Sequence, residues 1–293
     1  MKTTKSKNPH LYYALLLNLG MLFISTSGVL GRYIALPPPV SIWFRSLIAI
    51  LLLLLYARYK KFRFQINWKK HGAAVWWSGF FMALHWITYF FALQWSNVAI
   101  GMLSLFTYPI ITVFLEPFFM PVQLQKRHLL LGVLILIGIY FLVPEFDLKN
   151  TATQGLLIGL FSALAYSLRN LILKKHNAMG NGSIQMIYQL GVIVLLLLPV
   201  LWIYPDADLS SQWPYLLVLG AVTTALGHTL FLSSFSYFSI STASILSSVQ
   251  PLFGVLLGAL FLSEIPDLKS IFGGLLILTT VVLESRSARS KKI

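Results

Sequence analysis

The sequence predicts an all-α integral membrane protein of ten transmembrane helices that form two inverted five-helix repeats. Three observations lead to this prediction: an apolar composition, a regular succession of long apolar blocks, and a likeness between the two halves of the chain. Hydrophobic residues make up 57% of the 293 residues and charged residues 10%, whereas soluble domains carry about 25% charged residues. A block of about 20 apolar residues has the length that a helix needs to cross a bilayer.

The apolar spans are separated by connectors that contain helix-breaking residues. Examples are Pro37–Pro39 and Gly180–Gly182, and these residue types favour turns. We interpret the first span as a transmembrane helix rather than a cleaved signal peptide, because it is long and has no evident cleavage site. The predicted spans are 11–34, 41–59, 73–95, 99–120, 128–143, 154–173, 184–204, 213–235, 240–262 and 269–284.

The distribution of charges supports this number of spans. With the N-terminus in the cytoplasm, seventeen of the 22 basic residues fall in cytoplasmic segments, and most acidic residues fall on the opposite side. Lys and Arg are normally enriched in the cytoplasmic loops of membrane proteins. We therefore expect a multi-pass protein of the cytoplasmic (inner) membrane with both termini in the cytoplasm. The lipid bilayer is the expected partner, and nucleic acid is not, because the net charge of +14 is spread between apolar blocks.

The two halves of the chain align when they are offset by 142 residues. Identical residues then coincide, such as Pro109 with Pro251 and Gly132 with Gly274, and the span boundaries fall in register. Five spans per half is an odd number, so the second half must be inverted relative to the first. Inverted repeats are typical of transporters and predict a binding site near the membrane midplane, between the halves. The predicted segments are a tail (1–10), a first repeat (11–143), a linker (144–153), a second repeat (154–284) and a basic tail (285–293).

Certain residues recur in the two halves: in the first half Ser96–Ile100, Pro109 and Gly132, and in the second Ser239–Ala243, Pro251, Glu264, Gly273 and Gly274. This pattern resembles the EamA-type repeat of the drug/metabolite transporter superfamily. Arg45 after Pro39 is similar to the family's Pro…Arg pattern in the second helix. The resemblance covers residues 11–284 and implies a ten-helix fold that often exports amino acids or related metabolites. Val122 stands where the second half has Glu264, and the first helix lacks the acid that couples small multidrug-resistance relatives to protons.

An aromatic and histidine cluster near the middle of the third span is the first candidate for substrate binding. His85 and Tyr89 are four residues apart and share a helix face, and Trp86 lies beside them. His228 aligns with Trp86 in the second half. Neutral imidazole can donate and accept hydrogen bonds, and aromatic rings offer apolar walls with polar edges. The alternatives are a hydrogen bond to a neighbouring helix for His85, a structural role for His228, and packing for Trp86.

Tyr108 and Gln250 are further candidates for substrate binding, because each precedes one of the paired prolines. Pro109 and Pro251 predict a kink or break in the fourth span of each half. A polar side chain beside a bent helix at the midplane is suited to a substrate site. The alternative for Gln250 is a hydrogen bond between helices.

Three charged residues at membrane depth are candidates for gating or ion pairing. Glu116 and Arg169 are predicted to lie at similar depth, so we expect an ion pair that either gates the inner side or is a static contact. Arg45, near the outer end of the second span, would attract an anion, pair with an acid of the outer loops, or extend toward the interface.

These patterns together predict a secondary transporter or exporter of a small, amino-acid-like amphiphile that works by alternating access, and not an enzyme. The alternatives are an integral-membrane enzyme acting on a lipid or metabolite and a carrier of phosphorylated sugars, although no Lys lies at depth to bind phosphate. The chain contains no Cys, and we expect no metal and no cofactor. Proton coupling, and the choice between monomer and homodimer, stay open.

Overall fold

The computed structural model describes residues 9–62, 64, 66–142, 146–176, 182–234, 247 and 249–290, and every regular element among them is a helix. In the first half the helices are α1 (Pro9–Tyr33), α2 (Pro38–Tyr59), α3 (Trp68–Trp95), α4 (Val98–Leu105), α5 (Tyr108–Phe119) and α6 (Lys126–Tyr140). In the second half they are α7 (Thr151–His176), α8 (Gly182–Leu196), α9 (Val200–Ile203), α10 (Trp213–Val218), the π-helical η1 (Leu219–Gly227), α11 (His228–Ser234), α13 (Gln250–Leu262) and α14 (Leu268–Ser290).

Among the described residues, six helical segments are long and apolar enough to cross a membrane: 12–33, 38–59, 98–119, 151–176, 182–203 and 213–231. Two shorter apolar helices occupy 250–262 and 268–283. The predicted spans fall on helices wherever the structure describes them. The first part of the predicted span 240–262 lies outside the described residues, apart from Ser247 and Val249.

Local sequence explains where several helices begin. The side chain of Asn67 accepts a hydrogen bond from the N–H of Lys70 at 3.2 Å, and that of Asn97 accepts one from Ile100 at 2.8 Å. Asparagine suits such positions because its oxygen satisfies an N–H group that has no partner in the first helical turn. Prolines in the first turn mark the starts of α2, α5 and α13.

Pro109 and Pro251 lie at helix starts rather than in the middle of continuous helices. Pro109 follows a break at residues 106–107, between α4 and α5, and Pro251 is the second residue of α13. Proline fits a first helical turn because its missing N–H would have no helical partner there. The predicted interruption near Pro109 is therefore present, as a break between two helices.

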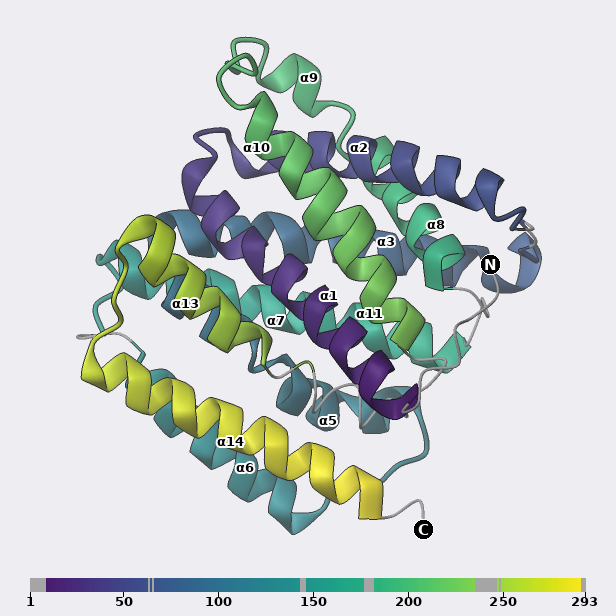
Figure 1. Cartoon of the computed structure of the whole chain (residues 1–293). Coiled ribbons are helices and arrows are strands. Elements are labelled where there is room, and N and C mark those ends of the chain that lie inside the picture. The colour runs from purple at the N-terminus through teal and green to yellow at the C-terminus, as the bar shows by residue number, and fades with distance from the viewer. Residues whose placement is uncertain are drawn as a thin grey trace.

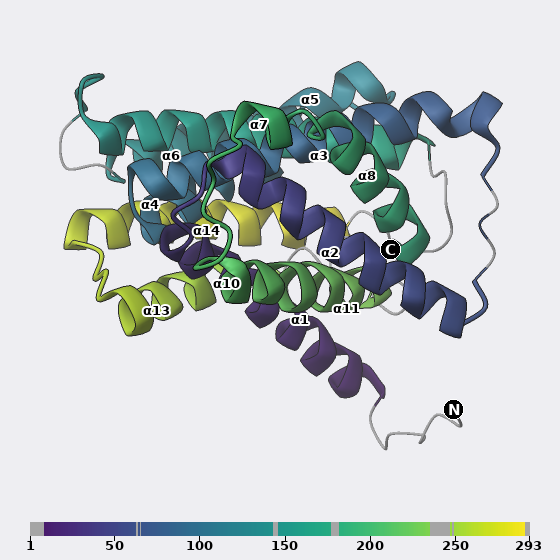
Figure 2. The same cartoon turned by 90° about the horizontal axis from the view of Figure 1, so that it is seen from above.

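The helices pack into a bundle in which both halves of the chain mix. α3 packs along α7 and α8, whereas α1 packs against α13, η1 and α11. In Figure 2, α3 and α7 lie along one side of the molecule, and α13 with α10 and α11 lie along the other. α6 and α14 run side by side at one edge of Figure 1.

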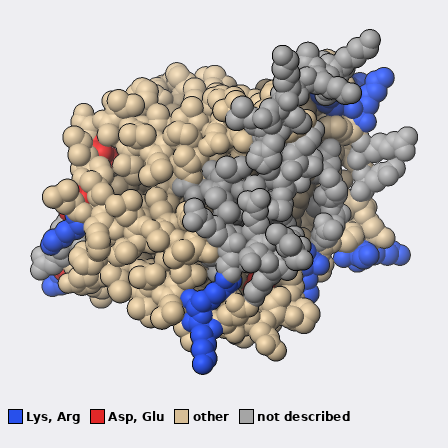
Figure 3. All heavy atoms as spheres, turned by 60° about the horizontal axis from the view of Figure 1, so that its bottom comes forward, with Lys and Arg blue, Asp and Glu red and all other residues tan. Residues whose placement is uncertain are grey.

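The outer surface of the bundle is strongly apolar. Many large hydrophobic side chains are exposed, among them Leu55, Leu130, Tyr140 and Leu260. On the face in Figure 3, the charged side chains lie mainly toward the margins, and a broad uncharged surface separates them. A surface of this kind fits the hydrocarbon core of a bilayer.

Candidate functional site

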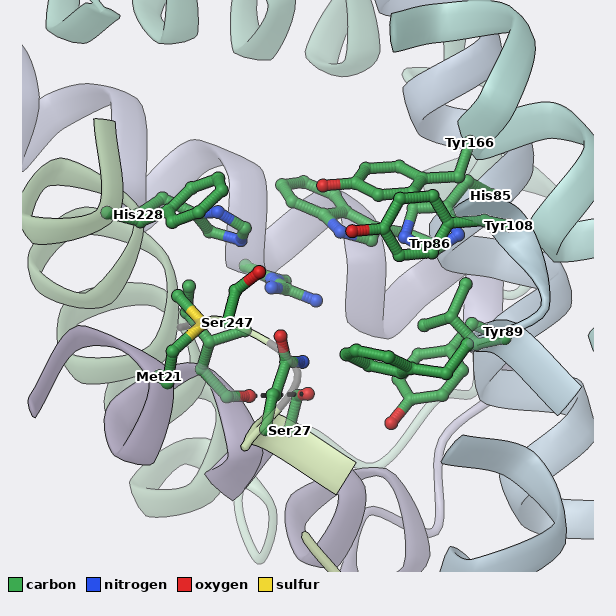
Figure 4. Close-up of a pocket in the computed structure, with 15 residues that line it drawn as sticks. Met21, Ser27, His85, Trp86, Tyr89, Tyr108, Tyr166, His228 and Ser247 are labelled. Atoms are coloured by element: carbon green, nitrogen blue, oxygen red, sulfur yellow. Dashed lines mark hydrogen bonds between the residues drawn. The ribbon is translucent and has the colours of Figure 1, made fainter. Parts of the chain in front are cut away.

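A cavity lies inside the bundle and is lined by residues of both halves. It encloses about 580 Å³ of space between side chains, including its open part. Its lining residues are Met21, Ile24, Ser27, Arg45, His85, Trp86, Tyr89, Leu105, Phe106, Tyr108, Tyr166, His228, Phe231, Ser247 and Gln250. Figure 4 shows the labelled aromatic and histidine side chains from α3, α5, α7 and α11 around this space. The structure therefore brings together all six predicted binding residues, and it adds Arg45 to them.

His85 is held in a cluster of aromatic rings on one wall of the cavity. Its ring centroid lies 4.6 Å from that of Tyr166 and 6.1 Å from that of Tyr89. The Tyr108 ring meets the Tyr166 ring edge-on at 4.8 Å. Tyr166 was not predicted from the sequence. The 142-residue offset makes it equivalent to Ile24, which also lines the cavity.

Ser162 fixes the protonation pattern of the His85 ring. The Ser162 hydroxyl donates to the backbone carbonyl of His85 at 2.8 Å, and its oxygen lies 2.8 Å from Nδ1 of the same residue. A hydroxyl has one proton to donate, so Nδ1 must carry the hydrogen in the second contact. Nε2 of the neutral imidazole is then an acceptor that can serve a ligand.

Arg45 crosses from α2 into the cavity instead of reaching toward the outer loops. Its guanidinium carbon lies 3.9 Å above the ring of Trp86, and its side chain is 1% exposed. Nε donates to the hydroxyl of Thr224 at 2.6 Å, and that hydroxyl donates to the carbonyl of Leu219 in η1 at 2.8 Å. The buried Nη1 atom of Arg45 has no hydrogen-bond partner among the described residues.

The opposite wall contains His228, whose ring lies 5.9 Å from that of Trp86. Its buried Nε2 atom, like the hydroxyl of Tyr89, has no hydrogen-bond partner in the part of the chain that the structure describes. Buried polar groups without partners are uncommon in folded proteins and call for an explanation. With Nη1 of Arg45, these are three buried polar atoms of cavity-lining residues that have no hydrogen-bond partner among the described residues.

Two hydrogen bonds at the ends of the cavity repeat each other across the two halves. The Ser25 hydroxyl of α1 shares its proton between the carbonyls of Gln250 at 2.9 Å and Met21 at 2.7 Å. The Ser167 hydroxyl of α7 likewise shares its proton between the carbonyls of Tyr108 at 2.9 Å and Ala163 at 2.8 Å. Ser25 and Ser167 are 142 positions apart, and so are Tyr108 and Gln250. Each of the two bonds between the halves joins the first span of one half to the residue before the paired proline of the other half.

The same offset relates ten of the fifteen lining residues. The five pairs are Ile24 with Tyr166, Trp86 with His228, Tyr89 with Phe231, Leu105 with Ser247, and Tyr108 with Gln250. The cavity is therefore built from equivalent positions of the two halves.

The predicted ion pair between Glu116 and Arg169 is wrong. Glu116 pairs with Lys174, which is nearer the end of α7 and more exposed to solvent. Arg169 is buried and donates to the side-chain oxygens of Gln189 at 3.0 Å and Asn170 at 2.9 Å. Amide oxygens thus satisfy the buried cation, and neither Glu116 nor Arg169 lines the cavity.

A second ion pair lies at the C-terminal end of α1. Arg32 Nε donates to Glu264 at 2.8 Å, and the other carboxylate oxygen of Glu264 accepts the N–H of Val98 at 2.8 Å. Val98 is the first residue of α4, where the helix dipole favours a negative charge. Arg32 also donates to the carbonyl of Gln94 at the end of α3 at 3.1 Å. This contact therefore joins the ends of α1, α3, α4 and α13.

Comparisons with known proteins agree with this architecture. An uncharacterized transporter of Archaeoglobus fulgidus is 28% identical over 191 residues, which is 65% of this chain and 68% of that protein. Pseudopaline exporter CntI of Pseudomonas aeruginosa is 24% identical over 184 residues, which is 62% of this chain and 63% of that protein. A solved crystal structure superposes on 97% of this chain and 99% of its own, with a TM-score of 0.67 and 16% identity, which shows the fold alone.

The model of the EamA-like transporter family matches the chain twice, at residues 11–143 and 153–286. These matches cover nearly the whole sequence. The apolar helices and the transporter names of the relatives are consistent with them. The protein is a multi-pass membrane transporter that belongs to the EamA-like transporter family.

Proposed function

We propose that the protein is a secondary transporter that exports a small, amino-acid-like amphiphile across the cytoplasmic membrane by alternating access. The observation that carries this proposal is the cavity built from equivalent positions of the two halves. Transporters with inverted repeats bind substrate near the midplane, where the repeats meet. The name of the CntI relative, a pseudopaline exporter, favours export of a metabolite.

The proposed architecture has ten spans arranged as two inverted five-helix repeats, with both termini in the cytoplasm. The reciprocal bonds of Ser25 with Gln250 and of Ser167 with Tyr108 support it. Around a pseudo-twofold axis, a contact between a hydroxyl of one half and a carbonyl of the other is expected to have a counterpart in which the two halves exchange these roles. The contact between the equivalent residues Trp86 and His228 supports the same axis, because two such residues can touch only near it.

The two ion pairs are suited to act as gates on opposite sides of the membrane. Arg32 and Lys174 are 142 positions apart, at the ends of the first spans of the two halves. Each pairs with an acid at or just beyond the end of the fourth span of the other half. In an inverted arrangement, the Arg32–Glu264 pair closes the outer side and the Lys174–Glu116 pair the inner side.

The strength of these contacts fits gates that open repeatedly. All four side chains are partly exposed, with accessible fractions of 31% and 19% for Arg32 and Glu264, and 50% and 21% for Lys174 and Glu116. An exposed ion pair contributes only about 0–1 kcal/mol. Either contact can therefore break at small cost when substrate binding favours the opposite opening.

Transport by liposomes that hold the purified protein tests this function. The experiment measures flux of labelled amino acids and related metabolites, with and without a pH gradient, for the wild type, His85→Ala and His176→Ala. His176 is exposed at the end of α7 and serves as the matched control. Saturable flux that His85→Ala loses and His176→Ala keeps is expected. Equal flux in all three proteins would contradict a transport route through the cavity.

A further inference from the structure

We propose that Arg45 binds the carboxylate of the substrate, so that the transported compounds are organic acids in which the amine is dispensable. This inference rests on the proposed transport function and specifies its substrate class. It follows from the surroundings of the Arg45 side chain, which is buried in the cavity without a counter-charge.

Among the acidic side chains that the structure describes, none is placed to neutralise Arg45. The chain has eight acidic residues, and none of the fifteen cavity-lining residues is among them. Of the acids whose side chains the structure describes, Glu116 and Glu264 pair with Lys174 and Arg32. The other four lie on exposed segments away from the cavity: Asp147, Asp206, Asp208 and Asp267. Burying a cation without a counter-charge is costly, so an anionic ligand that pairs with Arg45 is favoured because it offsets that cost.

The guanidinium is also held in one orientation. Trp86 supports its face at 3.9 Å, and Thr224 holds Nε at 2.6 Å. Nη1 then remains without a partner among the described residues. Arg in a fixed plane recognises planar carboxylates well because its N–H groups match their two oxygens. The lining residues Trp86, Tyr89 and Phe231 offer apolar surface for the rest of the ligand.

The described residues of the cavity provide no comparable group for a substrate amine. An ammonium ion would lie near Arg45 without any carboxylate to offset the repulsion. The histidine nitrogens can accept a hydrogen bond from a neutral donor, but they do not supply negative charge. We therefore expect acids without an amine to bind at least as well as the parent amino acids, and amines without the acid to bind poorly.

Two sets of three compounds test these expectations. The first set is L-phenylalanine, hydrocinnamate (no amine) and phenethylamine (no carboxylate), and the second is L-leucine, isocaproate and isoamylamine. Binding is measured with the purified full-length protein from the concentration dependence of its thermal unfolding temperature, and flux is measured in liposomes. The proteins compared are the wild type, Arg45→Gln, Arg45→Lys and Arg58→Gln. Arg58 lies on the same helix but is exposed.

The wild type and Arg58→Gln should bind the carboxylates and not the two amines. Arg45→Gln should raise the Kd of the carboxylates roughly 30-fold or more, because removing one partner of a buried charge pair weakens binding by that order. Arg45→Lys should keep part of the affinity. Thr224→Val keeps the charge and frees Nε, so it should weaken carboxylate binding several-fold and serves as a second variant if Arg45→Gln does not fold.

Three outcomes would overturn the inference: binding of the amines as tight as that of the acids, unchanged carboxylate affinity in Arg45→Gln, or no binding of any of the six compounds by the wild type. Failure of the transport proposal is a separate result. If carboxylates bound in a way that depends on Arg45 but no flux occurred in liposomes, the proposed binding site would be supported and the proposed transport function would be rejected.

Discussion

Trp86 and His228 stand at equivalent positions of the two halves, and their rings contact each other with centroids 5.9 Å apart. The guanidinium of Arg45 also lies over the Trp86 ring. The residues that would sit nearest a pseudo-twofold axis are thus chemically different: one is an indole and the other an imidazole. The cavity has a symmetrical frame but an asymmetrical lining, which suits a small ligand that has one polar end.

The first prediction concerns the two ion pairs as gates. The chain has no Cys, so a single Ser27→Cys substitution places one thiol in the cavity lining. Glu264→Ala should increase labelling of this thiol by a membrane-impermeant maleimide in intact cells, and Glu116→Ala should increase it in inverted vesicles. Loss of an exposed ion pair shifts the equilibrium by about 0.5–1 kcal/mol, so the labelling rates should rise roughly two- to fivefold.

A thiol at Ser210, in an exposed segment that the proposed topology places on the outer side, is the control for the labelling of intact cells. Its labelling should be the same in all proteins, because no gate covers it. Increased labelling from the same side in both variants would contradict the assignment of the two pairs to opposite faces. The double variant Glu116→Lys with Lys174→Glu should return the rate toward that of the wild type.

The second prediction concerns the hydrogen bonds between Ser162 and His85. Ser162→Ala removes the acceptor of Nδ1–H and the donor to the His85 carbonyl, so buried polar groups lose their partner. The expected cost is about 1–3 kcal/mol, seen as a lower thermal unfolding temperature than that of the control Ser210→Ala. Nitrogen NMR of histidine-labelled protein should show the Nδ1–H form of His85 in the wild type, and an Nε2–H form would contradict the geometry.

The sequence alone predicts the helical spans and the cavity residues well, for physical reasons. Apolar blocks have to cross the bilayer, and a His or Tyr at midplane depth is costly facing lipid. His85 and His228 could therefore be placed on the interior from their depth, and Tyr89 and Tyr108 were singled out by a His four residues away and by an adjacent Pro. Tyr166 was not predicted because it has neither of these neighbours.

The partners of the charged residues could not be predicted in the same way. Depth along a span places Glu116 and Arg169 at a similar level, but it does not say which faces of α5 and α7 meet. Packing of α5 on α7 leaves Glu116 beside Lys174, whereas Arg169 turns inward to Gln189. Arg45 shows the same limit, since its contact with Trp86 depends on how α2 packs against α3.

The third prediction concerns Asp267, which caps the start of α14 outside the predicted spans. Its carboxylate accepts the N–H of Ser270 at 2.6 Å, and this hydrogen bond lowers the pKa of Asp267 below its usual value. A lowered pKa stabilises the fold above the usual carboxyl pKa, and the contribution disappears as the pH falls through the folded-state pKa. Asp267→Ala should therefore cost about 0.5–2 kcal/mol at neutral pH, with a smaller difference from the wild type in unfolding temperature in acid. A difference that grows in acid would contradict this role.

The fourth prediction concerns the close approach of α4 and α7 beside the cavity. A Cβ atom on Gly159 would overlap the hydroxyl of Ser104, and Ser104 is itself fully buried. Gly159→Ala should therefore force the helices apart and cost about 1–3 kcal/mol, with a lower thermal unfolding temperature. Adding Ser104→Gly removes the side chain that the new methyl group meets, so the double variant should recover most of the lost stability. Gly72→Ala is the control, because a Cβ at Gly72 meets only Trp68 at 3.4 Å. If Ser104→Gly failed to restore stability, the cost of Gly159→Ala would have to arise elsewhere than at this contact.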